Sequence, residues 1–335
     1  MNCWDVSSIT DMSELFKDKS TFNEPIRCWN VGKVTNMYAM FYNATKINQA
    51  IGNWEVSSVT NMAAMFSDAT SFNQAIDTWN VVRVTSMRWM FAYATSFNQY
   101  IGNWNVSKVI DMGAMFTYAT SFNQDIGNWN VGKAAYMDYM FFVATTFNQA
   151  IGNWNVSKVT DMSNMLGSAT KFNQAIGNWN VSSVTTMEGM LGGATNFNQA
   201  IGNWNVSKVT VMRYMFATNG ATNFNQAIGN WDVSKVTTME AMFFNAGSFN
   251  QAIGNWNVSK VTNMYGMFSG ATNFSQDLCA WYNNMQSTTS VNEMLLSSAC
   301  TDPADPNLST KSSFCQACNC SEGKSYTEMS YDNLF

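Results

Sequence analysis

The chain has 335 residues, of which 46% are hydrophobic and 12% are charged, and its formal net charge is −5. This hydrophobic share is sufficient for a buried core, so the composition excludes an intrinsically disordered chain. The mild negative charge argues against a nucleic-acid partner. No apolar run reaches the length of about 18 residues that predicts a membrane span.

The chain begins in the middle of a repeat. Cys3-Trp4-Asp5-Val6 matches Cys28-Trp29-Asn30-Val31 in the next repeat. A stack of repeats normally needs a terminal cap over its exposed end. We therefore expect upstream sequence, such as a secretion signal or further repeats, before Met1.

A tryptophan recurs along the whole chain at a step of 25 residues, with a single step of 27. The members of this column are Trp4, Trp29, Trp54, Trp79, Trp104, Trp129, Trp154, Trp179, Trp204, Trp231, Trp256 and Trp281. Such a period is typical of proteins in which each repeat buries its apolar side against its neighbours. We predict a repeat domain over residues 1–278, a degenerate last coil with a cysteine-rich cap over 279–320, and a polar tail over 321–335.

The repeat Phe147–Lys171 predicts the fold of one coil. Gly152-Asn153 is a bend, and Trp154 and Val156 have the alternation of a short strand. Helical spacing follows at Val159, Met162, Met165, Leu166 and Ala169. The predicted fold class is therefore α/β: a right-handed solenoid of about twelve coils, each with a short parallel strand and a short helix.

Two further columns are interpreted as structural. The methionine at Met162 recurs in the other repeats, and we expect it to fill the core rather than to bind a soft metal. The asparagine at Asn148 recurs in Phe-Asn-Gln triplets, and stacked amides of this kind satisfy buried backbone groups. No cofactor and no metal site is predicted.

The repeat resembles the BspA-type leucine-rich-repeat-like surface proteins, whose repeats are also described as DUF285 or mycoplasma-lipoprotein-type repeats. The resemblance rests on the register of FNQAIGNWNVSKVTDMSNML and covers residues 1–299. It implies a leucine-rich-repeat-like solenoid, secreted or on a cell surface, with roles in adhesion and in contact with proteins or matrix. It supplies no catalytic residue. The ending around Cys279 resembles the versions in eukaryotic microbes more than the bacterial lipoproteins.

The seven cysteines predict disulfides. Cys3 and Cys28 share a repeat position, which would place their Cα atoms about 4.8 Å apart, within disulfide range. At least two disulfides are predicted to cap the C-terminal end, from the set Cys279, Cys300, Cys315, Cys318 and Cys320. A thiolate metal site is the alternative, but the chain has no histidine, and an extracellular context favours disulfides. With an odd number, one thiol stays free, or pairs with the upstream sequence expected before Met1 or with another chain.

Nine Asn-x-Ser/Thr sequons are candidates for glycosylation. They are Asn43, Asn105, Asn155, Asn180, Asn205, Asn257, Asn273, Asn307 and Asn319. Five come from the repeated Trp-Asn-Val-Ser, where an unmodified outward polar residue is the simpler interpretation. Asn43 is favoured because it lies in a variable loop.

Two sets of outward residues are candidates for binding. The first is an aromatic patch, interpreted as an interface rather than chance variation: Tyr38, Tyr42, Trp89, Tyr93, Tyr118, Tyr136, Tyr139 and Phe142. The second is a basic row: Lys33, Arg83, Lys108, Lys133, Lys158, Lys208, Lys235 and Lys260. The basic row is either a solvated edge that discourages aggregation or a site for an anionic polysaccharide.

Catalysis is not predicted, because the chain has no histidine, no Gly-rich phosphate loop and no carboxylate pair outside the repeat. The predicted function is a non-enzymatic structural or adhesive scaffold, extracellular or at the cell surface. It would contact other protein chains, including copies of itself. The alternatives are a recognition ectodomain for a glycan or anionic polysaccharide and, remotely, an ice-binding protein. Ice binding rests on a column of threonines at coil corners, which capping explains more simply.

Overall fold

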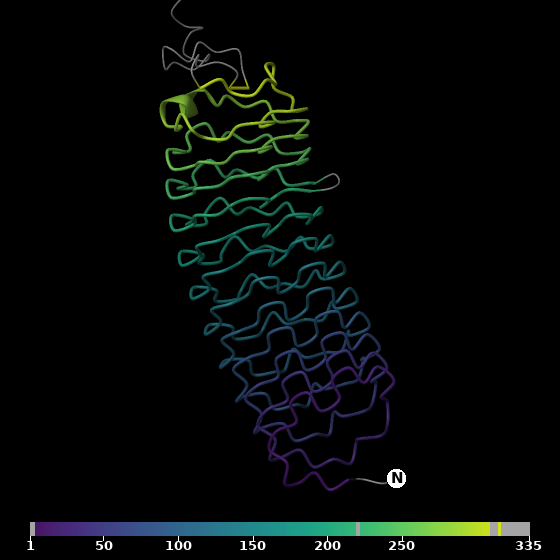
Figure 1. Ribbon diagram of the computed structural model, residues 1–335. Coiled ribbons are helices and arrows are strands. Elements are labelled where there is room, and N and C mark those ends of the chain that lie inside the picture. Colours follow the sequence, from purple (N-terminus) through teal and green to yellow (C-terminus); the bar gives the residue numbers. More distant parts are fainter. Residues whose placement is uncertain (1–3, 219–221, 309–313, 316–335) are drawn as a thin grey trace, which may run out of the picture. The chain divides into compact units, whose positions relative to one another are not determined.

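The computed structural model describes residues 4–218, 222–308 and 314–315. It consists of two units, Met1–Trp179 and Asn180–Phe335. Within each unit the chain winds through successive coils, which can be followed by colour in Figure 1. The domain boundaries predicted after residues 278 and 320 stay predictions, and the predicted tail lies outside the described residues.

Coils of the same unit are aligned in the register of the repeat. In the first unit, parallel backbone bridges join Asn36 to Asn61 and Asn61 to Ser86, and the series continues to Asp161. In the second unit the series runs from Thr186 to Ser290. Equivalent residues of neighbouring repeats therefore lie beside one another, and each repeat position forms a column along its unit.

The prediction of an α/β solenoid with a strand and a helix in every coil is wrong. The only helix in the described part of the chain is the 3-10 helix η1 (Cys279–Asn283). The bridges between coils are isolated ones, so the described residues form no sheet. The coils are built from turns instead.

The segment predicted as a helix shows why. In the second repeat, Ala39 and Asn43 have left-handed backbone conformations, with φ of 52° and 56°. The Phe41 N–H donates to the Met65 carbonyl of the next coil (2.9 Å), whereas the Tyr42 N–H donates back to Ala39 (3.0 Å). An α-helix requires each N–H to bond four residues back in its own segment. Here alternate N–H groups bond within the coil and to its neighbour.

The predicted strand is likewise a pair of turns. The Trp154 N–H donates to the Ile151 carbonyl (3.1 Å), and the Val159 N–H donates to the Val156 carbonyl (2.9 Å). The side chains of Trp154 and Val156 are nevertheless buried, as their alternation predicts. The side-chain pattern was right and the backbone assignment was not.

From Trp29 to Trp281 the tryptophan column lies in the core, whereas Trp4 at its first position is 69% exposed. Trp154 is 3% exposed, and its ring stacks on Trp129 with the centroids 6.4 Å apart. Its Nε1–H donates to the Ile126 carbonyl of the preceding coil (3.1 Å). The same indole-to-carbonyl bond recurs from coil to coil, for example from Trp104 to Ile76. Each indole therefore combines apolar packing with a bond between neighbouring coils.

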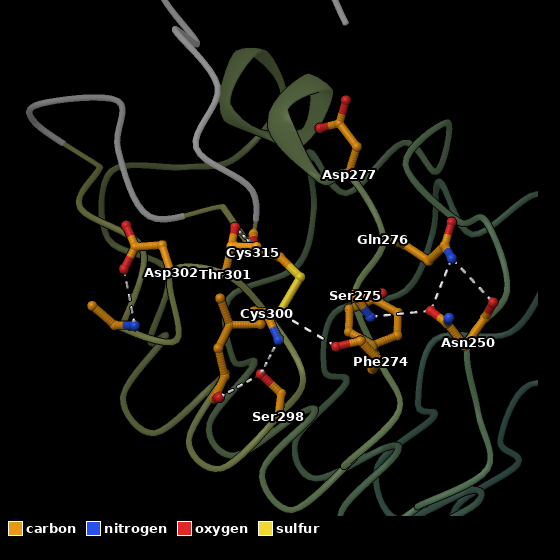
Figure 2. The surroundings of a disulfide bond; sticks show 12 residues. Asn250, Phe274, Ser275, Gln276, Asp277, Ser298, Cys300, Thr301, Asp302 and Cys315 are labelled. Atoms are coloured by element: carbon orange, nitrogen blue, oxygen red, sulfur yellow. Dashed lines mark hydrogen bonds between the residues drawn. A yellow bond between two sulfur atoms is a disulfide. The ribbon is translucent and has the colours of Figure 1, made fainter. Parts of the chain in front are cut away.

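The asparagine column connects neighbouring coils. The Asn98 Oδ1 accepts hydrogen bonds from the Asn123 N–H and the Gln124 Nε2, both at 3.0 Å. Figure 2 shows the same arrangement around Asn250, which accepts from the next coil. The amides satisfy backbone groups, as the sequence predicts.

A disulfide closes the last described coil (Figure 2). Cys300 and Cys315 are bonded to each other, and the Thr301 N–H donates to the Cys315 carbonyl (3.0 Å). Phe314 beside it is fully buried. The Asp305 carboxylate accepts from the Met294 N–H (3.0 Å) and from the residue before it, Glu293, and so takes the place of a following coil.

The remaining cysteines are only partly described. Cys28 and Cys279 are also disulfide-bonded. Cys3, Cys318 and Cys320 lie outside the described residues. The predicted pairing of Cys3 with Cys28 therefore stays a prediction.

Candidate functional site

Two columns with left-handed backbone carry large aromatic residues in the first unit. The column of Ala39 holds Trp89 (φ 59°) and Tyr139 (φ 56°). The column of Asn43 holds Tyr93 (φ 57°) and Tyr118 (φ 55°). The side chains of Trp89, Tyr93 and Tyr139 are exposed, by 48%, 42% and 39%.

These residues surround a pocket of about 420 Å³. Its aromatic lining consists of Tyr42, Trp89, Tyr93 and Tyr139. Small buried residues line the bottom: Ser67, Ala92, Ala114 and Thr117. The pocket exists because small residues occupy the central coils while aromatic residues occupy neighbouring positions of the same columns. We name it the aromatic pocket.

Ring contacts extend the aromatic pocket into a larger patch. Tyr93 stacks on Tyr118 at 4.6 Å between centroids, and Phe142 makes edge contacts with Tyr118 (5.7 Å) and Tyr139 (5.4 Å). Six of the eight predicted interface residues therefore gather here. Tyr38 and Tyr136 are exposed but do not line the pocket.

At one side of the pocket, an ion pair joins two coils across the coil that lies between them. The Arg88 guanidinium donates two hydrogen bonds to Asp138 (3.1 and 2.6 Å) and a third to Asp111 (3.3 Å). The bonds to Asp138 raise the pKa of Arg88; burial opposes this rise, and the charges of Asp138 and Asp111 add to it. Gly113 lies between them, and a Cβ there would meet the Arg88 Cζ and an Asp138 oxygen, each at 2.8 Å. The missing side chain lets Arg88 reach across.

Asp68 contributes a second charge to the pocket. Its carboxylate is half-buried, and burial raises its pKa above the ordinary value, while a hydrogen bond from the Ser67 hydroxyl (3.5 Å) opposes the rise. No cation lies within ion-pair distance of it among the residues that the structure describes. Burial also raises the pKa of Tyr93, with smaller effects from Tyr118 and Asp68.

We expect Asp68→Asn to raise the melting temperature near neutral pH. Above its raised pKa the half-buried carboxylate is charged and destabilises the folded state. Below that pKa it is protonated, and the penalty disappears. The gain from Asp68→Asn should therefore shrink as the pH falls through the raised pKa of Asp68, which thermal melts of both proteins across an acidic pH series will measure. A gain that does not change with pH would contradict this account.

Sequence reasoning found the aromatic residues but missed Asp68, Arg88, Gly113 and Asp138. Arg88, Gly113 and Asp138 occupy one column in three successive coils. An alignment of the repeats shows a signal for this ion pair, because two opposite charges stand in one column with a glycine between them. It was missed because Arg88 and Asp138 are 50 residues apart in the sequence.

The family of the chain follows from a comparison with family models. The model described as "Mycoplasma protein of unknown function, DUF285" matches residues 1–92, 74–169, 144–219 and 217–304. The chain belongs to this family. The predicted resemblance to DUF285 repeats is thereby confirmed. No curated protein and no solved structure matches the chain.

All eight residues of the basic row of this DUF285 protein are exposed, five in the first unit and three in the second. None of its eight residues forms an ion pair with a carboxylate in the described part of the chain. This arrangement suits a solvated edge and an anionic ligand equally well. The polysaccharide alternative stays a prediction.

The sequons fall into different environments. Asn43, the favoured candidate, is half-buried, and its Nδ2 donates to Asp18 (2.9 Å), so the nitrogen that would carry a glycan is engaged. The five Trp-Asn-Val-Ser asparagines are exposed, and their Oδ1 atoms accept from the backbone two residues on, as in Asn155 with Ser157 (3.2 Å). Their position is thus better suited to modification than that of Asn43. Asn319 lies outside the described residues, and glycosylation itself stays a prediction.

The threonines behind the ice-binding alternative are engaged between coils. The Thr45 hydroxyl donates to the Ser20 carbonyl (3.1 Å) and the Thr70 hydroxyl to the Thr45 carbonyl (3.4 Å). This is the capping role expected for them. As to membranes, none of the described helices has the length and hydropathy of a membrane-spanning segment.

Proposed function

We propose that this DUF285 protein is a non-enzymatic scaffold, outside the cell or on its surface, that binds other protein chains through the aromatic pocket. Copies of itself are included among these partners. The observation that carries the proposal is the presence of Trp89, Tyr93 and Tyr139 at left-handed backbone positions.

Such positions favour glycine. A side chain in the left-handed conformation costs about 1–2 kcal/mol, and glycine avoids this cost. The second unit contains glycine at the equivalent positions of two coils: Gly189, Gly193, Gly266 and Gly270. The coils therefore form with glycine there, and folding gives no reason for large aromatic residues at the same positions.

The aromatic residues also remain exposed, so their burial does not offset the strain. Strained residues gather at functional sites, and exposed tryptophan and tyrosine are enriched at protein interfaces. The disulfide between Cys300 and Cys315 supports an oxidising, extracellular location. The absence of histidine from the sequence supports a role without acid–base catalysis.

A triple glycine variant separates binding from folding. We expect Trp89→Gly, Tyr93→Gly and Tyr139→Gly together to raise the free energy of unfolding by about 1–3 kcal/mol, because the left-handed strain is removed. The same variant should lose association. Sedimentation velocity over a concentration series measures self-association, and a biosensor panel of purified matrix and surface proteins measures binding to other chains.

The matched control is the pair Asn164→Gly and Ser168→Gly, at the same column positions but outside the pocket. This control should be stabilised and should bind like the parent. The proposal fails if the triple variant associates normally, or if the parent binds neither itself nor any protein of the panel.

A further inference from the structure

The charges of the aromatic pocket do not balance. Its charged lining residues are Asp68, Arg88 and Asp138. Arg88 is committed to Asp138, whose side chain is 13% exposed, and to Asp111 outside the lining. The carboxylate of Asp68 is therefore the charge without an opposite partner among the described residues.

The surroundings of Asp68 suit a cation. Half-burial removes water from the carboxylate without supplying a positive charge, which is unfavourable until a cation arrives. Asp68, Tyr93 and Tyr118 occupy one column: Asp68 lies one coil before Tyr93, and Tyr118 lies one coil after Tyr93. Because Tyr118 stacks on one face of Tyr93, the other face of Tyr93 is turned toward the coil of Asp68. A carboxylate and an aromatic face are thus presented together.

The remaining rings extend this environment. Cations bind favourably over the faces of tryptophan and tyrosine within about 6 Å of the centroid. Two lining rings already have such neighbours, since Lys17 lies 5.9 Å from the Tyr42 centroid and Arg88 lies 5.5 Å from that of Trp89. Tyr93 and Tyr139 have no such neighbour among the described residues, so no cation of the described part of the chain already lies over these two rings.

We infer that the aromatic pocket receives a basic side chain, arginine or lysine, displayed by the partner protein, with Asp68 as its counter-charge and Tyr93 as its aromatic wall. This inference rests on the proposed function and names the chemistry of the partner. The basic group would pair with the Asp68 carboxylate and lie against the free face of Tyr93. Its aliphatic stem would contact the small buried residues Ala92 and Ala114.

The test uses short Gly-Ser peptides with one central residue: arginine, lysine or citrulline. Citrulline has the shape of arginine without its charge, so it reports on charge alone. The peptides are immobilised on a biosensor, and the full chain is applied at low ionic strength. We expect the arginine and lysine peptides to bind and the citrulline peptide to bind about tenfold more weakly, as expected for loss of a partly desolvated charge pair.

The key variant is Asp68→Asn, which keeps the shape of the side chain. The control is Asp18→Asn, which removes the same charge from the same column, at a site outside the pocket. Asp68→Asn should weaken binding of the arginine peptide about tenfold, whereas Asp18→Asn should bind like the parent. Equal effects of both variants would show that only the net charge matters and would overturn the inference.

Two other outcomes would overturn it. One is equal binding of the citrulline and arginine peptides. The other is binding of a neutral oligosaccharide that is lost in Trp89→Gly and kept in Asp68→Asn, which would assign the pocket to a sugar. The proposed function is judged separately, by association of the triple glycine variant. If that variant loses association while no basic peptide binds, the inference fails and the proposed function stands.

Discussion

Trp154→Ala is expected to lower the free energy of unfolding by about 3–5 kcal/mol, the range for truncating a large buried aromatic residue. The indole of Trp154 is almost fully buried and stacks on Trp129. The substitution would leave a cavity and also remove the donor to the Ile126 carbonyl. Chemical denaturation followed by circular dichroism measures the change.

Trp89→Ala is the matched control, because the same truncation is made at an exposed tryptophan. It should change the free energy of unfolding little. If the Trp154 and Trp89 variants unfold at the same denaturant concentration, the tryptophan column does not stabilise the coils as described.

The double substitution Cys300→Ser and Cys315→Ser is expected to destabilise the C-terminal end by about 3 kcal/mol, the value for a disulfide that closes a loop of this length. The two cysteines are 15 residues apart. The bond holds Phe314 over the last described coil, where Phe314 also contacts the Tyr282 ring edge-on at 6.2 Å. Without the bond, this end should open before the rest of its unit.

Hydrogen exchange with mass spectrometry will locate the effect. Peptides around Met294 and Phe314 should lose protection in the double variant, and peptides of the first unit should serve as the unchanged internal control. Equal protection at Phe314 in the variant and the parent would mean that the disulfide does not hold this end closed.

The inward columns could be predicted because burial depends only on which residues recur at which position. Met162 and Leu166 are buried as the spacing indicates. The backbone could not be obtained in this way, since a turn with a left-handed residue every fourth position presents the same apolar face as a helix. A usable signal was present: one repeat position holds Asn43 and Asp68 in the first unit and Gly193 and Gly270 in the second, the residue types that favour the left-handed conformation.

The candidate site could likewise be predicted only in part. Trp89, Tyr93 and Tyr139 were predicted because they are aromatic at outward positions. Asp68 and the Arg88–Asp138 pair were missed because their roles depend on contacts between coils. Whether a charged side chain is paired can be recognised only when the residues of the neighbouring coils are known.

The alternating hydrogen bonds have an electrical consequence. In the first unit, the N–H groups of Ala39 and Phe41 point toward the following coil, whereas the N–H of Thr60 and the indole of Trp54 point toward the preceding one. Peptide dipoles add along an α-helix because they are aligned head to tail. Here the two sets are opposed, so the dipoles of one set partly offset those of the other as coils are added to a unit.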